Sequence, residues 1–179
     1  MAYLGTNKIW LASDRSSYFE HDTSTGNASF QGDELGHRRP LYNGTSDATK
    51  TLTSADSGGL TVFNRAAGLV VTLPTAETGW YHDFQVLTSV TSNSYKVITG
   101  AATEFIKGLL VSVDTDTSNT LAYDQVGNGS THVAVTMNGT TTGGLIYTKF
   151  RLTCVSATLW AVDGVNFGSG TVATPFATS

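Results

Sequence analysis

Short runs of alternating apolar and polar residues, each ended by glycine, proline or a Ser/Thr/Asn-rich turn, fill the chain from residue 50 onward. A period of two predicts β-strands, because successive side chains of a strand point to opposite faces. No segment has a sustained helical period. We expect strands at 50–53, 60–64, 69–73, 81–87, 95–99, 104–106, 109–113, 120–123, 132–137, 145–155 and 159–162. Many short strands with frequent turns predict an all-β fold: a compact β-sandwich, jelly roll or small barrel.

The first 49 residues differ from this pattern. Their aromatic residues are scattered, and no strand or helix period is sustained, although a short strand or helical turn could form at Lys8–Ala12. We therefore predict three parts: an extended N-terminal arm at 1–49, a β-rich domain at 50–165 and a loose, Gly/Ser/Thr-rich C-terminal tail at 166–179. A break near 114–119 could divide the β-rich domain into two subdomains.

The arm contains too many aromatic residues for a passive linker and too few apolar residues in register to build its own core. A segment of this kind becomes ordered by lying on another surface. The motif Arg38-Arg39-Pro40-Leu41-Tyr42 places two guanidinium groups beside an apolar pair that the proline stiffens. This motif could also bind a surface rich in carboxylates. The candidate partner-binding residues are Ile9, Trp10, Tyr18, Phe19, Arg38, Arg39, Leu41 and Tyr42.

Charge and cysteine content narrow the function classes. Charged residues make up 13% of the chain and the net charge is −4, with no basic block beyond Arg38-Arg39. Such a surface does not favour nucleic-acid binding, which depends on clustered cations. No apolar stretch reaches the length of a membrane span, and the opening segment lacks the apolar core of a signal peptide. The single cysteine, Cys154, is expected to be a buried small hydrophobe, which fits assembly in a reducing cytoplasm.

The sequence gives little support for catalysis or for a cofactor. Residues 114–119 place oxygen ligands at alternate positions, as a calcium loop does, but the loop glycine and the bidentate glutamate are missing. The histidines lack the spacing of a zinc site. Carboxylates occur singly, and the glycine-rich segment 139–144 predicts a flexible hairpin tip. We therefore expect no metal, no cofactor and no enzymatic activity.

One segment resembles a known protein family. The stretch Thr51-Leu52-Thr53-Ser54-Ala55-Asp56-Ser57-Gly58 is followed by Phe63, Gly68, Val71-Thr72-Leu73-Pro74, Gly79, Phe84 and Val86. This pattern resembles a module of tailed-bacteriophage virion structural proteins, especially the head decoration (cement) proteins, and also of some tail-fibre proteins. The resemblance implies β-rich subunits, often trimeric, that bind neighbouring major capsid protein subunits on the outer head surface.

The function expected from the sequence is thus a non-enzymatic capsid decoration protein, made in the host cytoplasm and located on the outer surface of the virion. Its partners would be the major capsid protein and other copies of itself, as a homotrimer. The alternative is a tail-fibre or receptor-binding module that holds host glycan on aromatic platforms such as Trp80, Tyr81 or Trp160, although a core position is the favoured interpretation for each. A polysaccharide-cleaving enzyme is a third class.

Overall fold

The protein is described from a computed structural model of the 179-residue chain, in which residues 6–10, 18–22, 27–31, 39–116 and 121–179 are described. The chain divides into two compact units, 1–39 and 40–179. The predicted boundary at residue 49 is therefore too late, because residues 40–49 belong with the larger unit.

The first unit contains a three-stranded antiparallel sheet in the order β1-β2-β3. Its strands are β1 (Thr6–Trp10), β2 (Tyr18–Asp22) and β3 (Asn27–Gln31). The sequence predicts instead an extended arm with at most one short element near Lys8. The difference arises because these strands are short and polar, so that pairing between them, rather than periodicity within each, defines the element.

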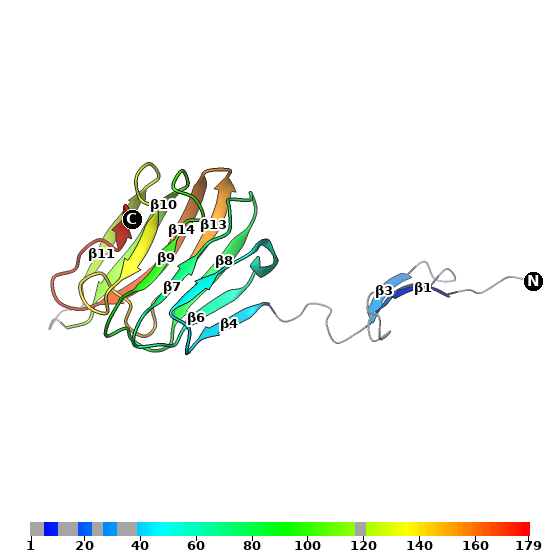
Figure 1. Cartoon of the computed structure of the whole chain (residues 1–179), viewed down its shortest axis with the longest axis horizontal. Coiled ribbons are helices and arrows are strands. Elements are labelled where there is room, and N and C mark those ends of the chain that lie inside the picture. Colours follow the sequence, from blue (N-terminus) through cyan, green and yellow to red (C-terminus); the bar gives the residue numbers. More distant parts are fainter. Residues whose placement is uncertain (1–5, 11–17, 23–26, 32–38, 117–120) are drawn as a thin grey trace, which may run out of the picture. The chain divides into compact units, whose positions relative to one another are not determined.

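The second unit begins with six strands that alternate between two sheets. In chain order they are β4 (Leu41–Gly44), β5 (Thr49–Thr51), β6 (Leu60–Phe63), β7 (Leu69–Thr72), β8 (Tyr81–Val86) and β9 (Tyr95–Ile98). The even-numbered strands pair in parallel in one sheet, and the odd-numbered strands pair in parallel in the other. The chain therefore winds from one sheet to the other and back, as the coils of a solenoid do (Figure 1).

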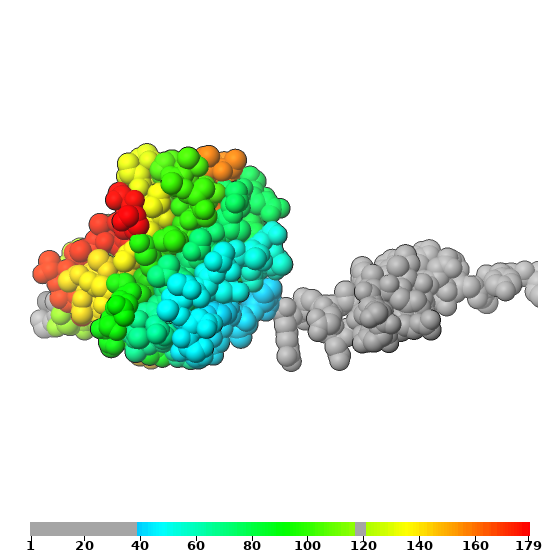
Figure 2. Space-filling view, in the orientation of Figure 1, coloured from blue at the N-terminus to red at the C-terminus, as the bar shows by residue number. Residues whose placement is uncertain are grey.

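The remaining strands complete both sheets. They are β10 (Phe105–Asp114), β11 (Ala122–Asn128), β12 (Ala134–Met137), β13 (Lys149–Ser156), β14 (Leu159–Gly168) and β15 (Phe176–Ala177). The seven-stranded sheet has the order β11-β10-β14-β13-β8-β6-β4, and the five-stranded sheet has the order β15-β12-β9-β7-β5. All pairs among these later strands are antiparallel except β10 with β14. Figure 2 views the unit from the side of the five-stranded sheet, whose colours run from red at β15 to cyan at β5.

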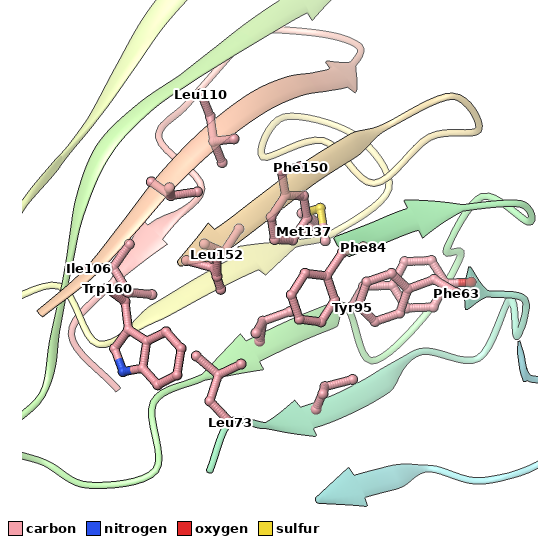
Figure 3. Packing of buried hydrophobic residues seen from close by; sticks show 14 of the residues in the cluster. Phe63, Leu73, Phe84, Tyr95, Ile106, Leu110, Met137, Phe150, Leu152 and Trp160 are labelled. Carbon is pink, nitrogen blue, oxygen red and sulfur yellow. The ribbon is translucent and has the colours of Figure 1, made fainter. Parts of the chain in front are cut away.

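The core lies between the two sheets, as it does in a β-sandwich (Figure 3). Phe84 of the seven-stranded sheet stacks on Phe150 at 5.0 Å, and Phe63 meets Tyr95 of the five-stranded sheet at 4.6 Å between ring centroids. Trp160 is fully buried and meets Trp80 edge-on. The predicted all-β class is therefore confirmed, and of the architectures proposed the structure is a sandwich of two mixed sheets.

The strand-turn segment at 51–59 is fixed by a local cap. A single turn of 3-10 helix spans Ser54–Asp56. The Asp56 carboxylate accepts hydrogen bonds from the Thr53 backbone N–H at 2.7 Å and from its hydroxyl at 2.9 Å. These hydrogen bonds outweigh the opposing effect of partial burial and lower the pKa of Asp56. The carboxylate thus holds the chain in the turn that connects β5 to β6.

Three further expectations about the second unit are wrong. The tail at 166–179 is not loose, because β14 continues to Gly168 and Phe176 of β15 is buried against His132. Residues 139–144 are not a flexible hairpin tip, since they cross from β12 in one sheet to β13 in the other. Residues 40–179 form one compact unit, without two subdomains.

Among the described residues, no helix has the length and apolar character that a bilayer crossing would need.

Candidate interaction surfaces

Four of the predicted partner-binding residues lie together in the sheet of the first unit. The register places Ile9 opposite Phe19 and Trp10 opposite Tyr18. Phe19 is in turn opposite Phe30 on β3. Successive residues alternate between faces, so the row Ile9–Phe19–Phe30 belongs to one face of the sheet and the row that holds Trp10 and Tyr18 to the other.

The predicted Arg38-Arg39-Pro40-Leu41-Tyr42 motif spans the boundary between the units. Arg38 lies outside the described residues, and Arg39 is exposed. Leu41 and Tyr42 were predicted to lie on the arm, but they lie on β4 of the seven-stranded sheet. Leu41 is 65% exposed.

Tyr42 is held in place by its neighbours. Its hydroxyl donates to Asp47 at 2.9 Å, and the Lys50 ammonium lies over its ring at 5.1 Å. Partial burial and the Asp47 carboxylate together raise the pKa of Tyr42. Tyr42 therefore has a structural role at the edge of the sandwich, whatever else it contacts.

The buried reactive groups of the second unit all serve the fold. Cys154 is 1% exposed, its thiol contacts the Ser156 carbonyl, and burial raises its pKa, so the expectation of a buried small hydrophobe is confirmed. The buried Glu104 carboxylate accepts from Trp160 Nε1 at 3.0 Å and from the Ala76 N–H at 2.8 Å.

His82 is a second buried group with a structural role. Its Nδ1 lies 2.8 Å from the Asp56 carbonyl and its Nε2 lies 3.0 Å from the Thr61 hydroxyl. A carbonyl can only accept, so Nδ1 carries the proton and Nε2 accepts from Thr61. Trp80, proposed as a glycan platform, stacks on this imidazole and is 3% exposed, and Trp160 is fully buried; both are therefore core residues. Of the three proposed platforms only Tyr81 reaches the surface, at 38% exposed.

Two aspartates interact where β10 ends: Asp114 is its last residue, and Asp116 lies in the turn that follows. Asp114 and Asp116 share a hydrogen bond between their side chains, which raises the pKa of Asp114 and lowers that of Asp116. Asp116 also accepts from the Gly170 N–H at 2.6 Å. Residues 117–119 of the suggested calcium loop lie outside the described part of the chain. Among the residues that the structure does describe, no group of three or more His, Cys, Asp or Glu side chains could hold a metal ion.

The outer face of the five-stranded sheet mixes polar and apolar residues. Thr49, Thr51, Thr72, Thr136 and Lys96 lie in the same outward-facing rows as Val70, Ile98 and Ala134. On the seven-stranded sheet a row of apolar residues runs across five strands or their ends. This row, called the apolar row below, consists of Leu87, Tyr147, Phe167, Val113 and Ala122.

The apolar row is exposed at both ends and half-buried at its centre. Tyr147 is 70% exposed and Leu87 is 57% exposed. The Tyr147 ring meets the Phe167 ring edge-on at 6.4 Å, and the Tyr147 N–H donates to Val86 at 3.3 Å. Tyr147 has a φ of 76°, a left-handed conformation that is strained for a residue with a side chain. The fold therefore presents a large aromatic side chain to solvent at a backbone cost.

The neighbouring rows are more polar. The second row consists of Gln85, Lys149, Val165, Val111 and Asp124 in register across the same strands. In the third row the Arg151 guanidinium binds Asp83 through two hydrogen bonds of 2.7 and 2.9 Å and lies over the Tyr81 ring. That hydrogen bonding raises the pKa of Arg151. The outer face thus has an apolar row beside two rows that mix charged and apolar side chains, and the third row includes Leu109 and Val126, which are 41% and 61% exposed.

The apolar row was not predicted from the sequence. Its residues come from segments as far apart as 87 and 167, so no local pattern contains it. One signal was present: Leu109-Leu110-Val111 is continuously apolar, and such a run indicates a strand with apolar residues on both faces. Comparison of the chain with protein-family models, with curated proteins and with solved structures gives no match.

Proposed function

We propose that this chain is a non-enzymatic capsid decoration protein that binds major capsid protein subunits on the outer surface of a virion head, chiefly through its first unit. The resemblance of residues 51–86 to bacteriophage decoration proteins supplies the biological setting, and the architecture is compatible with that role. The trimer expected from the resemblance is part of the same proposal.

The observation that carries the proposal is the small size of the first unit. Three strands of five residues form a sheet that is marginal in water unless one face is covered. Units below about 40 residues usually need a disulfide, a metal or an assembly partner. The chain's one cysteine, Cys154, lies in the second unit, so no disulfide can supply this stability. Burial of the Ile9–Phe19–Phe30 row against another protein would supply it.

The second unit would then serve as a rigid body on the capsid. Its buried thiol, imidazole and carboxylate are engaged in structural hydrogen bonds. A low charge content allows such modules to pack closely at the particle surface. Several anchored copies multiply weak contacts through effective concentration.

The test is deletion of residues 1–39, followed by binding to undecorated capsids. The earlier boundary at residue 49 would be the wrong site for the cut, because it would remove β4 and expose β6. We expect the truncated protein to remain folded by circular dichroism and to lose capsid binding. Full occupancy by the truncated protein would refute the assigned role of the first unit.

Point variants sharpen the test. Ile9→Ala and Phe19→Ala, both in the Ile9–Phe19–Phe30 row, should weaken capsid binding at least about tenfold if that row is the anchor. Tyr123→Ala is the matched control, because it removes an aromatic side chain that is 40% exposed in the second unit. A signal on a glycan array, without capsid binding by the intact protein, would instead support the receptor-binding alternative.

A further inference from the structure

The second unit has a surface for self-association on the seven-stranded sheet. We propose that the apolar row and the second row form a two-fold interface with a second copy of the chain. The contact stacks the outer faces of two seven-stranded sheets with the symmetry axis in the interface and along the strands. It is separate from the trimer proposed above and does not depend on capsid binding.

The second row carries opposite charges at its two ends. Lys149 on β13 and Asp124 on β11 flank the pair Val165 and Val111. Both charged residues are exposed, and among the described residues neither side chain has an ion-pair or hydrogen-bond partner. Outward-facing charges that lack partners beside an apolar row are typical of an interface rim.

A two-fold axis along the strands, between β14 and β10, matches these charges. The rotation exchanges the left and right ends of each row, so Lys149 of one copy faces Asp124 of the other, and the reverse. Val165 then faces Val111. Each contact occurs twice, as an isologous interface requires. An axis across the strands through the second row would instead place Lys149 against Lys149 and Asp124 against Asp124, and is therefore disfavoured.

The apolar row is complementary under the same operation. Tyr147 of one copy faces Ala122 of the other, and Phe167 faces Val113. Each large aromatic side chain therefore opposes a smaller one, which allows two sheets to approach to about 10 Å. The left-handed backbone at Tyr147, with its 70% exposed ring, is accounted for by a contact of this kind.

The contact area sets the expected affinity. Under this axis β13, β14, β10 and β11 face their counterparts, whereas β8 lies beyond β11 of the other copy. Four strands about 4.8 Å apart and three rows about 6.8 Å apart cover a footprint on the order of 400 Å² per copy, with the third row as the rim. This area is below the roughly 800 Å² per partner of standard stable complexes. We therefore expect a dissociation constant in the micromolar range, with association that weakens as salt screens the Lys149–Asp124 pairs.

The test is charge reversal in the intact protein, measured by sedimentation velocity over micromolar concentrations. Lys149→Asp and Asp124→Lys each place like charges at both symmetric positions and should weaken association at least about tenfold. The double variant Lys149→Asp/Asp124→Lys should restore it. Lys96→Asp is the matched control, with the same charge change on the outer face of the five-stranded sheet, and should behave as the wild type. Circular dichroism checks that each variant is folded.

The outcomes are distinguishable. The single variants lack the two-fold contact, so their molecular mass reports any assembly formed by other surfaces, including the proposed trimer. In the wild type the two-fold contact should double that mass. A wild type whose mass is independent of concentration would overturn the interface. Single reversals that leave association unchanged, or a double variant that fails to restore it, would do the same. Loss of capsid binding after deletion of residues 1–39 affects none of these results.

Discussion

Replacement of Asn166 by alanine should be among the most destabilising single changes in the second unit. Asn166 lies on β14, is 1% exposed and holds the crossing between the two sheets. Its Oδ1 accepts from the Gly144 N–H at 3.1 Å, and its Nδ2 donates to the Thr142 carbonyl at 3.0 Å. A longer contact of 3.3 Å joins Nδ2 to the Ser112 hydroxyl.

The magnitude follows from the groups that lose their partners. Gly144 is buried, so its N–H would carry a full penalty of about 1–3 kcal/mol. The Thr142 carbonyl is half-buried and can regain some hydration, so about 1 kcal/mol is added there. We expect a total loss of roughly 2–4 kcal/mol in the free energy of unfolding, or roughly 5–15 °C in Tm.

Urea unfolding followed by tryptophan fluorescence measures this loss. The midpoint should fall with an unchanged slope, because the native state stays compact. The matched control, Asn43→Ala on the exposed outer side of β4, should change stability by less than about 0.5 kcal/mol. A loss below about 1 kcal/mol for Asn166→Ala would show that the crossing is not held by this amide, and would refute the reasoning.

A second variant tests the donor separately. Asn166→Asp keeps the acceptor oxygen for Gly144 but places a carboxylate where an amide donated to Thr142. Burial without a cation should raise the pKa of this carboxyl in the folded state. Folding then favours the protonated form. The free energy of unfolding of the variant should therefore fall further below that of the wild type as pH rises above about 4, and the difference should shrink at lower pH. A deficit that does not vary with pH would contradict a buried site.

Three further predictions concern local features, each measured by denaturation or thiol labelling. Gly108→Ala should lower the free energy of unfolding by more than about 2 kcal/mol, because a Cβ there would lie 2.1 Å from the Val162 carbonyl oxygen. Gly79→Ala is the control: a Cβ there has no neighbour within 4 Å, so the loss should be only the left-handed backbone penalty of about 1–2 kcal/mol. Asp56→Ala should cost about 1 kcal/mol at neutral pH, and the difference should vanish as pH falls through the lowered pKa of Asp56, because that stabilisation requires the ionised carboxylate. Cys154 should react with a thiol reagent only on unfolding, because burial raises its pKa and excludes the reagent, and rapid native-state labelling would contradict the assigned burial.

Much of the strand content of the second unit could be predicted from sequence because its signals are local. The runs at 60–64, 69–73, 81–87 and 95–99 differ from β6, β7, β8 and β9 by at most one residue at an end. Alternation places Phe84 and Val86 on the core side, and Pro74 follows the end of β7 closely. What could not be predicted is that these strands alternate between sheets in parallel, since that pairing depends on contacts between residues distant in sequence.

The candidate surfaces show the same limit more strongly. Ile9 and Phe19 could be recognised as apolar residues in a polar segment, but their direct opposition depends on the register of β1 and β2. The tail was misjudged because its Gly/Ser/Thr composition resembles a linker, whereas the Phe176 ring alone gives β15 a reason to pack. The composition of the tail reports only its local preference for disorder, whereas the stacking of Phe176 on His132 orders it in the folded protein.

If both proposed contacts form, they would reinforce one another on a particle. The two-fold contact would join second units, while the sheet of the first unit would anchor each chain, so a bound pair would have two anchors in place of one. When two chains are anchored on neighbouring sites, the effective concentration of one second unit at the other is in the millimolar range. A micromolar dimer contact is then nearly saturated on the surface although it is weak in solution. Capsid decoration should therefore be less cooperative for the Lys149→Asp variant. The affinity of a single chain for a capsid site without occupied neighbours should stay unchanged. Equal cooperativity in wild type and variant would mean that neighbouring chains on the capsid do not meet through the apolar row.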